Sequence, residues 1–176
     1  MSASAGRSNI SEKKDWNTPP KYVKIINEFF DGVDLDPCSN EYSLINSKVK
    51  YILPTDGLKE SWDYKKIYVN PPYGRIKGSN VSISDWIKKG VDAYYNGSEL
   101  LYLIPVSTNI SYFKELIFIH ATGICFLNDT RLRFWSEGKE DKKGAPMACC
   151  FVYFGNDYQK FEDFFSSSGK CFKINQ

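Results

Sequence analysis

The residues best suited to chemistry are Asn70, Pro71, Pro72 and Tyr73, which follow the apolar run 67–69. A proline lacks an N–H group and restrains its own φ and the residue before it, so this tetrapeptide should leave a strand as a stiff loop. The side-chain oxygen of Asn70 and the carbonyl oxygen of Pro71 can then accept two hydrogens from one amino group. The ring of Tyr73 offers a flat face to a planar substrate.

Such a loop suits methyl transfer to a poorly nucleophilic nitrogen. The lone pair of an adenine amine or an amide is delocalised, and two acceptors that bind its hydrogens favour a pyramidal nitrogen with a localised lone pair. This nitrogen can attack an electrophilic methyl group, and a site that favours the reacting geometry accelerates the reaction. A proline-rich turn after a buried strand fits the same four residues, because short motifs also occur by chance.

Length and composition indicate one folded domain. The chain has 176 residues, of which 42% are hydrophobic and 16% aromatic, and it contains no apolar run long enough to cross a membrane. Residues 1–14 are polar and rich in serine, so we expect a disordered tail followed by a single domain at 15–176. A net charge of +2 does not by itself indicate a nucleic-acid-binding protein.

Cysteine and histidine usage excludes several kinds of site. The five cysteines include no C-x-x-C pair, which argues against a disulfide framework and a metal site and favours the cytoplasm. His120 is the only histidine and lies among apolar residues, so chemistry based on a catalytic histidine is not expected.

Alternating strands and helices must position the loop after residue 69. Hydrophobic periodicity and turn residues predict helices at 19–30, 43–47, 84–95, 111–119 and 157–166 and strands at 33–37, 49–53, 67–69, 100–106, 123–127, 131–135 and 148–154. In the first helix, Thr18 is the expected N-cap and Pro19 the first helical residue. This order predicts an α/β fold with a mostly parallel central sheet, helices on both faces and an antiparallel C-terminal end.

Two carboxylates follow predicted strands. Because ligands of open α/β sheets bind beyond the carboxyl ends of strands, Asp36 fits a contact with a cofactor better than Asp34 does. Asp56 can accept a hydrogen bond from the amino group of an adenine, although an ordinary Asp-Gly turn with Gly57 fits equally well. The hydroxyl group of Thr18 and the first N–H groups of its helix can hold a carboxylate, or simply cap that helix.

Basic residues occur in two segments that suit phosphate groups. Arg75 and Lys77 lie in the Gly-containing loop after Tyr73, and Arg131 and Arg133 alternate with apolar residues. An ordinary solvated loop and an edge strand protected by charge fit these segments as well.

Six segments, in this order, resemble the small phage- and prophage-type DNA N6-adenine methyltransferase family. They are Trp16–Pro19, Asp34–Pro37, Asp56–Leu58, Val69–Arg75, Leu103–Pro105 and Arg131–Phe134. The similarity runs from about Trp16 to Phe154 and implies a Rossmann-like methyltransferase fold. The chain departs from larger methyltransferases at Cys38-Ser39-Asn40, where they have a glycine turn, so the contact to the cofactor's ribose stays unassigned, with Asn40 and Glu41 as candidates.

The resemblance implies methyl transfer from S-adenosylmethionine to the exocyclic N6 amine of adenine in DNA, without a metal. The target base would flip into a pocket formed by Asn70, Pro71, Pro72 and Tyr73. The residues that would contact the cofactor are Trp16, Thr18, Pro19, Asp36, Pro37, Cys38, Asp56, Gly57 and Leu58. Arg75, Lys77, Arg131 and Arg133 would bind DNA. Sequence recognition would depend on the loops 75–82 and 136–146, with short or relaxed specificity.

Several alternatives stay open at this point. The same tetrapeptide occurs in methyltransferases that act on cytosine N4 or protein glutamine, RNA is a further possible substrate, and a non-catalytic nucleic-acid-binding module of the same fold is another. We expect a monomer or weak dimer in the cytoplasm of a bacterium or phage-infected cell. Roles in restriction-modification, immune evasion and regulation are not distinguished by the sequence.

Overall fold

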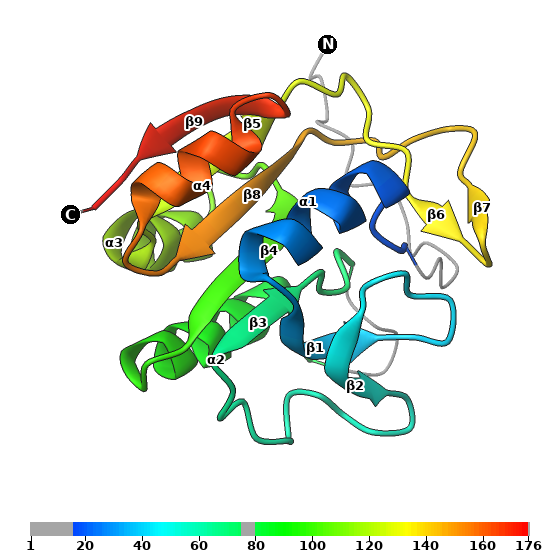
Figure 1. Ribbon diagram of the computed structural model, residues 1–176, viewed down its shortest axis with the longest axis horizontal. Coiled ribbons are helices and arrows are strands. Elements are labelled where there is room, and N and C mark those ends of the chain that lie inside the picture. The colour runs from blue at the N-terminus through cyan, green and yellow to red at the C-terminus, as the bar shows by residue number, and fades with distance from the viewer. Residues whose placement is uncertain (1–15, 75–79, 176) are drawn as a thin grey trace, which may run out of the picture.

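The computed structural model describes residues 16–74 and 80–175, and its main feature is a seven-stranded sheet with the order β2-β1-β3-β4-β8-β5-β9 (Figure 1). Its strands are β1 (Val33–Ser39), β2 (Ser47–Ile52), β3 (Lys66–Val69), β4 (Glu99–Pro105), β5 (Gly123–Leu127), β8 (Cys149–Phe154) and β9 (Gly169–Lys173). A separate ribbon pairs β6 (Trp135–Ser136) with β7 (Lys139–Glu140). The helices are α1 (Pro20–Phe30), α2 (Ile83–Tyr95), the π-helix η1 (Phe113–Ile117), α3 (Phe118–His120) and α4 (Tyr158–Phe165).

Strand directions confirm the predicted mixed sheet. Neighbours among β2, β1, β3 and β4 are parallel, whereas β8 is antiparallel to both β4 and β5, and β9 is antiparallel to β5. Thus only β8 and β9 run against the other five strands. The parallel part comes first in the chain and the antiparallel part last, as the sequence predicts.

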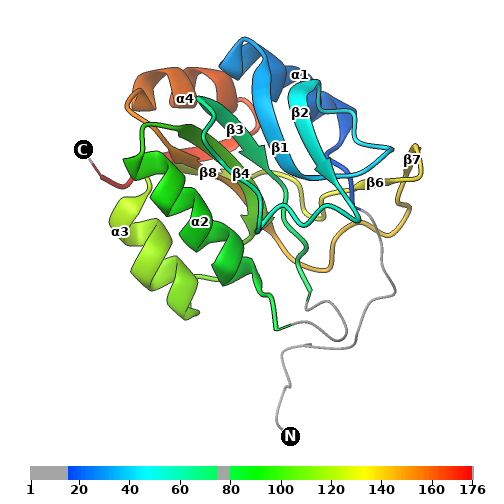
Figure 2. The same ribbon diagram turned by 90° about the horizontal axis from the view of Figure 1, so that it is seen from below.

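Helices cover both faces of the sheet (Figure 2). On one face, Phe29 of α1 and Phe161 of α4 pack in one core with Leu101 of β4. On the other, Ile87 of α2 packs in a second core with Tyr102 of β4. Successive β4 side chains thus enter opposite cores, as in a strand that is buried on both faces. None of the helices in the described ranges is long and apolar enough to span a membrane.

The strand order reverses next to β1. The chain runs from β1 to β2 on one side and then returns to form β3 on the other side of β1. Leu35 of β1 pairs with Ile67 of β3 in the parallel register, so the carboxyl ends of both strands meet at one edge of the sheet. Ligands of open α/β sheets bind outside such a reversal, and Asp36 and Asn70 both lie there.

The start of α1 differs from the prediction. The helix begins at Pro20 with Pro19 as N-cap, and Thr18 makes no capping bond. Instead the Thr18 hydroxyl group is buried and lies 2.6 Å from the hydroxyl group of Tyr68. The predicted end of the helix is confirmed, since Asp31 and Gly32 adopt positive φ and Gly32 N–H donates to the carbonyl of Asn27.

Two other predicted elements were wrong, and strand β9 was not predicted. The predicted helix at 43–47 is absent, since residues 43–46 form no helix and β2 begins at residue 47. Of the predicted strand at 131–135, residues 131–134 form no strand although their burial alternates, and only residue 135 belongs to a strand, β6. Leu132 and Phe134 are each 1% exposed and hold this extended segment in the core without a ladder. Strand β9 lies at the edge of the sheet and has only two buried residues, and its neighbours in the sequence are mostly polar. It therefore shows no clear apolar pattern.

Candidate active site

The side chain of Asn70 has a defined orientation at the end of β3. Its Nδ2 donates a hydrogen bond to the main-chain carbonyl of Trp16 over 2.7 Å. A carbonyl oxygen can only accept, so the NH₂ group must face Trp16 and Oδ1 must point elsewhere. Within residues 16–74 and 80–175, no group donates to that Oδ1. The acceptor that the sequence analysis requires is therefore held in place by the donor half of the same amide.

The rest of the predicted loop leaves the sheet as expected. Residues 70–72 belong to no helix or strand; Pro71 is buried and Pro72 exposed. The half-buried Tyr73 donates its hydroxyl hydrogen to the carbonyl of Leu103 in β4 over 3.0 Å. Burial raises the pKa of this hydroxyl group well above its usual range, so it stays a donor. The loop is thus attached at both ends.

Three aromatic rings meet beside this loop. The rings of Trp16 and Phe134 are stacked, with centroids 5.1 Å apart and an interplanar angle of 0°. The ring of Tyr73 lies edge-on to both, at 5.8 Å from Trp16 and 5.6 Å from Phe134. These residues are far apart in the chain. Their contacts bring the first motif (16–19) and the last motif (131–134) next to the loop after β3.

Asp36 is a buried carboxylate at the carboxyl end of β1. It is 4% exposed and accepts hydrogen bonds from the N–H of Cys38 at 3.2 Å and the hydroxyl group of Ser43 at 3.3 Å. Burial raises the pKa of Asp36 to about 6. A shifted carboxyl group at a ligand-binding edge is typical of functional sites.

The turn that contains Asp56 packs against the end of β1. A Cβ atom at Gly57 would lie 2.0 Å from the carbonyl oxygen of Pro37, so only glycine permits this approach. Trp62 Nε1 donates to the carbonyl of Gly57 over 2.8 Å and holds the turn there. Asp56 Oδ1 accepts from the N–H of Leu58 at 3.1 Å. Two predicted cofactor segments, 36–38 and 56–58, are therefore adjacent.

Asp34, the weaker of the two candidates in β1, has a structural role. Its carboxylate accepts a hydrogen bond from Lys48 Nζ at 2.7 Å and another from the N–H of Lys66 at 3.0 Å. These bonds connect β1 to both of its neighbours, β2 and β3.

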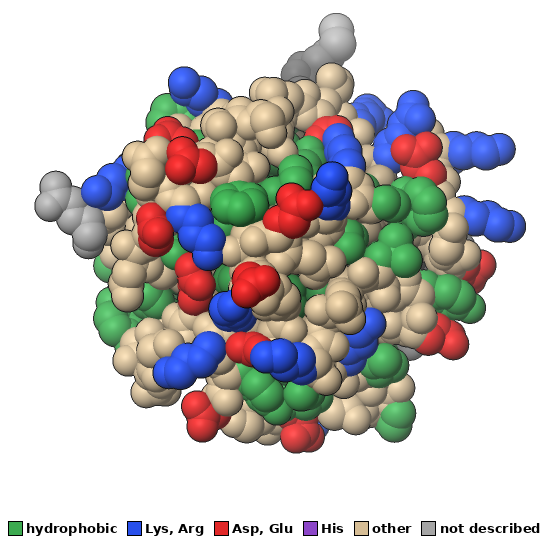
Figure 3. All heavy atoms as spheres, in the orientation of Figure 1, with side chains coloured by type: hydrophobic (Ala, Val, Ile, Leu, Met, Phe, Trp, Pro, Cys, Tyr) green, Lys and Arg blue, Asp and Glu red, His purple; other side chains and the backbone are tan. Residues whose placement is uncertain are grey.

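Of the four predicted basic residues, the structure describes two. Arg131 and Arg133 are exposed, and Arg133 lies 3.6 Å from Glu140. Together with Lys21, Asp129 and Trp135 they line a groove of about 370 Å³ beside the start of α1. Lys and Arg side chains also protrude from the side that carries β6 and β7 (Figure 3). Arg75 and Lys77, like the expected tail at 1–14, lie outside the described residues.

The hydroxyl group of Ser39, at the end of β1, was not predicted as a site residue. Trp16 Nε1 and Ser39 Oγ are buried without a hydrogen-bond partner among the described residues. Ser39 ends β1, close to the predicted cofactor segments. Its place in the unusual Cys38-Ser39-Asn40 turn was the only available signal, and that signal named no particular residue.

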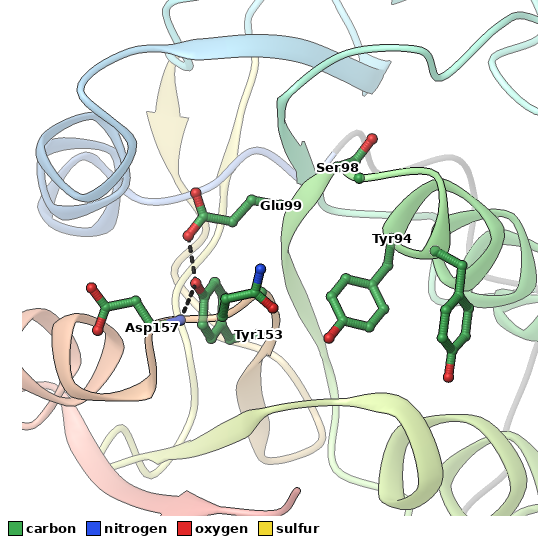
Figure 4. A pocket seen from close by; sticks show the side chains of 9 residues that line it. Tyr94, Ser98, Glu99, Tyr153 and Asp157 are labelled. Atoms are coloured by element: carbon green, nitrogen blue, oxygen red, sulfur yellow. Dashed lines mark hydrogen bonds between the residues drawn. The ribbon is translucent and has the colours of Figure 1, made fainter. Parts of the chain in front are cut away.

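A second pocket lies at the opposite edge of the sheet (Figure 4). It has a volume of about 430 Å³ and is lined by Glu99 at the start of β4 and by Tyr153 and Asp157. The hydroxyl group of Tyr153 donates to the carboxylate of Glu99 and accepts from the N–H of Asp157, which anchors the start of α4. Because Asn70 follows the other end of the parallel strands, this pocket is not part of the candidate site.

No cluster of three or more His, Cys, Asp or Glu side chains that could hold a metal ion occurs in the described ranges. All five cysteines are free thiols.

Comparison with known proteins identifies the family. A search of curated proteins gave no match. A family model described as DNA N-6-adenine-methyltransferase (Dam) matches residues 6–172. This match covers nearly the whole chain, confirms the resemblance of the ordered motifs and implies DNA adenine N6-methyltransferase activity, for which S-adenosylmethionine is the general methyl donor. The chain therefore belongs to the DNA N-6-adenine-methyltransferase (Dam) family.

Proposed function

We propose that this protein transfers a methyl group from S-adenosylmethionine to the N6 amine of an adenine that has flipped out of duplex DNA. The observation that carries the proposal is the orientation of Asn70. Its NH₂ group is bound to Trp16 over 2.7 Å, which leaves Oδ1 to accept hydrogens at the edge where the strand order reverses. Family membership supports adenine in DNA as the substrate.

The loop residues would act on the amine as hydrogen-bond acceptors. Asn70 Oδ1 and the Pro71 carbonyl bind the two N6 hydrogens and so favour the pyramidal nitrogen that attacks. S-adenosylmethionine, when bound, supplies the electrophilic methyl group. The hydrogen displaced from N6 leaves as a proton to solvent, so no strong base is needed. Tyr73 supports the flipped base, which would cost a few kcal/mol to extrude.

The end of β1 supplies groups that fit the cofactor. The carboxylate of Asp36 can accept hydrogen bonds from ribose hydroxyl groups, and the buried hydroxyl group of Ser39 lies at the same strand end. We place the adenine of the cofactor beside Asp56, Gly57 and Leu58, since this turn packs directly on Pro37. The segment Trp16–Pro19 would border the methionine end, within a Rossmann-like methyltransferase domain at 15–176.

Exposed cations around the site would bind the DNA backbone. Arg131 and Arg133 face a groove that begins next to α1, and Arg75 and Lys77 follow the catalytic loop in the sequence. These residues would position the duplex by contacts to phosphate groups. Recognition of bases would come from the loops 75–82 and 136–146, and we expect a short or relaxed target sequence.

Calorimetry combined with acceptor competition tests this proposal. The protein should bind S-adenosylmethionine and transfer a labelled methyl group to unmethylated duplex DNA in preference to RNA or bulk protein. Asn70→Ala should keep cofactor affinity and lose transfer, because only the acceptor for the amine is removed. Absence of cofactor binding would overturn the enzymatic proposal, and preferential labelling of RNA or protein would overturn the DNA substrate.

A further inference from the structure

We infer that Phe134 is a positioning residue for Asn70 and acts through Trp16, whose carbonyl sets the orientation of the Asn70 amide. The catalytic part of this inference rests on the proposed function. The contacts themselves do not, and they can be measured independently of any activity.

The hydrogen bond between Asn70 and Trp16 orients the Asn70 amide. If the amide rotated by half a turn, Oδ1 would face the Trp16 carbonyl, two acceptors would oppose each other, and the 2.7 Å hydrogen bond would be lost. The position of the Trp16 carbonyl therefore decides which atom of Asn70 faces a substrate amine.

The position of Trp16 depends on contacts of its ring and of the next residue. This residue precedes α1 and lies outside every helix and strand. Its indole Nε1 is buried without a partner among the described residues, so no bond from that atom fixes the ring. Three other contacts do: the ring stacks on Phe134, the ring of Tyr73 lies edge-on to it, and the next residue, Asn17, exchanges main-chain hydrogen bonds of 2.7 and 2.9 Å with Trp135.

Phe134 is itself held firmly by burial and by main-chain hydrogen bonds. Its side chain is 1% exposed, and its carbonyl accepts from the N–H of Asp141 at 2.7 Å. Two residues earlier, the carbonyl of Leu132 accepts from the N–H of Ala145, also at 2.7 Å. The segment 131–134 is thus fixed by main-chain bonds at both of these residues although it forms no ladder.

Phe134 therefore supports both functional side chains of the loop. It holds Asn70 through the stacked Trp16, and it contacts Tyr73 directly with ring centroids 5.6 Å apart. A side chain without a flat face would remove the stacking contact and leave Trp16 held by the edge of Tyr73 and by the bonds of Asn17, so that its carbonyl is less firmly positioned. Because a displacement of about 1 Å at a reacting group can cost about 100-fold in rate, this loosening should be visible in catalysis.

The test compares Phe134→Leu with the matched control Phe154→Leu. Phe154 is equally buried but ends β8 at the opposite edge of the sheet, where its ring contacts Tyr102. Side-chain NH₂ resonances of Asn70 are assigned in the ¹⁵N spectrum by their loss in Asn70→Ala. Single-turnover methyl transfer and the dissociation constant for S-adenosylmethionine are then measured for each variant.

We expect Phe134→Leu to shift the Asn70 NH₂ resonances towards those of exposed asparagines. Its transfer rate should fall by about 10-fold to 100-fold while cofactor affinity changes by less than about threefold. Phe134→Tyr, which keeps the aromatic ring, should retain most of the wild-type transfer rate. Phe154→Leu should lose similar stability without either effect. If Phe134→Leu does not fold, Phe134→Met removes the flat face with less loss of volume and takes its place.

Unchanged Asn70 resonances in the folded Phe134 variant, or equal effects of Phe154→Leu, would overturn the inference. A different outcome is that the wild type transfers no methyl group, while Phe134→Leu still shifts the Asn70 resonances and Phe154→Leu does not. This result would overturn the proposed function but would support the positioning contact.

Discussion

Asn70 uses two atoms of one amide for two purposes. Nδ2 is bound to the Trp16 carbonyl, and this fixes Oδ1 as the acceptor that a substrate amine would meet. An aspartate at this position would place an oxygen against the carbonyl and lose the bond. At this scale the sequence predicts the residue and its chemistry, but not the partner 54 positions away that orients it.

Asp36 gives a prediction about pH. Its folded pKa is about 6 because the carboxyl group is buried, against about 3.9 in an unfolded chain. The folded protein therefore binds more protons than the unfolded chain between about pH 4 and 6, and this residue lowers the free energy of unfolding as the pH rises through that window. Asp36→Asn should remove this contribution.

The measurement is urea unfolding of wild type and Asp36→Asn at pH 4 and pH 7. The free energy of unfolding of the variant relative to wild type should increase from pH 4 to pH 7 by on the order of 2 to 3 kcal/mol. Parallel pH dependence of the two proteins would show that Asp36 titrates normally in the folded state.

Among elements, the contact between the turn after β2 and the end of β1 assembles the proposed cofactor site. Gly57→Ala should displace this turn, because a Cβ atom would lie 2.0 Å from the Pro37 carbonyl oxygen. We expect a loss of about 1 to 3 kcal/mol in stability and weaker binding of S-adenosylmethionine in calorimetry.

Gly74→Ala is the matched control for stability, since a Cβ atom there has no neighbour within 4 Å among the described residues. It should change the free energy of unfolding by no more than about 0.5 kcal/mol. Equal stability and equal cofactor affinity in Gly57→Ala and wild type would contradict the proposed placement of the 56–58 turn.

Elements with strong periodicity were predictable, and others were not. The run 100–106 is apolar throughout, and all of it but its last residue lies in β4 (Glu99–Pro105) at the centre of the sheet. The segment 131–134 alternates like a strand because Leu132 and Phe134 are buried, yet its main chain bonds to residues 141 and 145 instead of forming a ladder. Periodicity reports burial, and the partner of the main chain depends on tertiary contacts.

Across the whole molecule, the candidate site combines segments 16–19, 36–38, 56–58, 70–73 and 131–134. The alternation of strands and helices was enough to predict the α/β class, and the order of the motifs was enough to predict the family. The stacking of Trp16 on Phe134 joins positions 118 residues apart, and no local pattern specifies such a pair.

The groove beside α1 gives a prediction about DNA binding. Arg131 is exposed there, while Lys21 and Arg133 lie within 4.0 Å of Asp129 and Glu140. Arg131→Ala should weaken binding to all duplex sequences alike and lower the slope of log Kd against log salt concentration by about 1. Lys173→Ala, an exposed position in the edge strand β9, is the control. An unchanged salt slope in Arg131→Ala would place the phosphate contact elsewhere.

The most direct test of the central claim is to identify the methylated nucleoside. Wild type and Asn70→Ala are incubated with S-adenosylmethionine and unmethylated duplex DNA, which is then digested to nucleosides and analysed by mass spectrometry. The proposed function predicts N6-methyladenine with wild type and none with Asn70→Ala. Methylated cytosine, or no modified base from a protein that binds the cofactor, would contradict it.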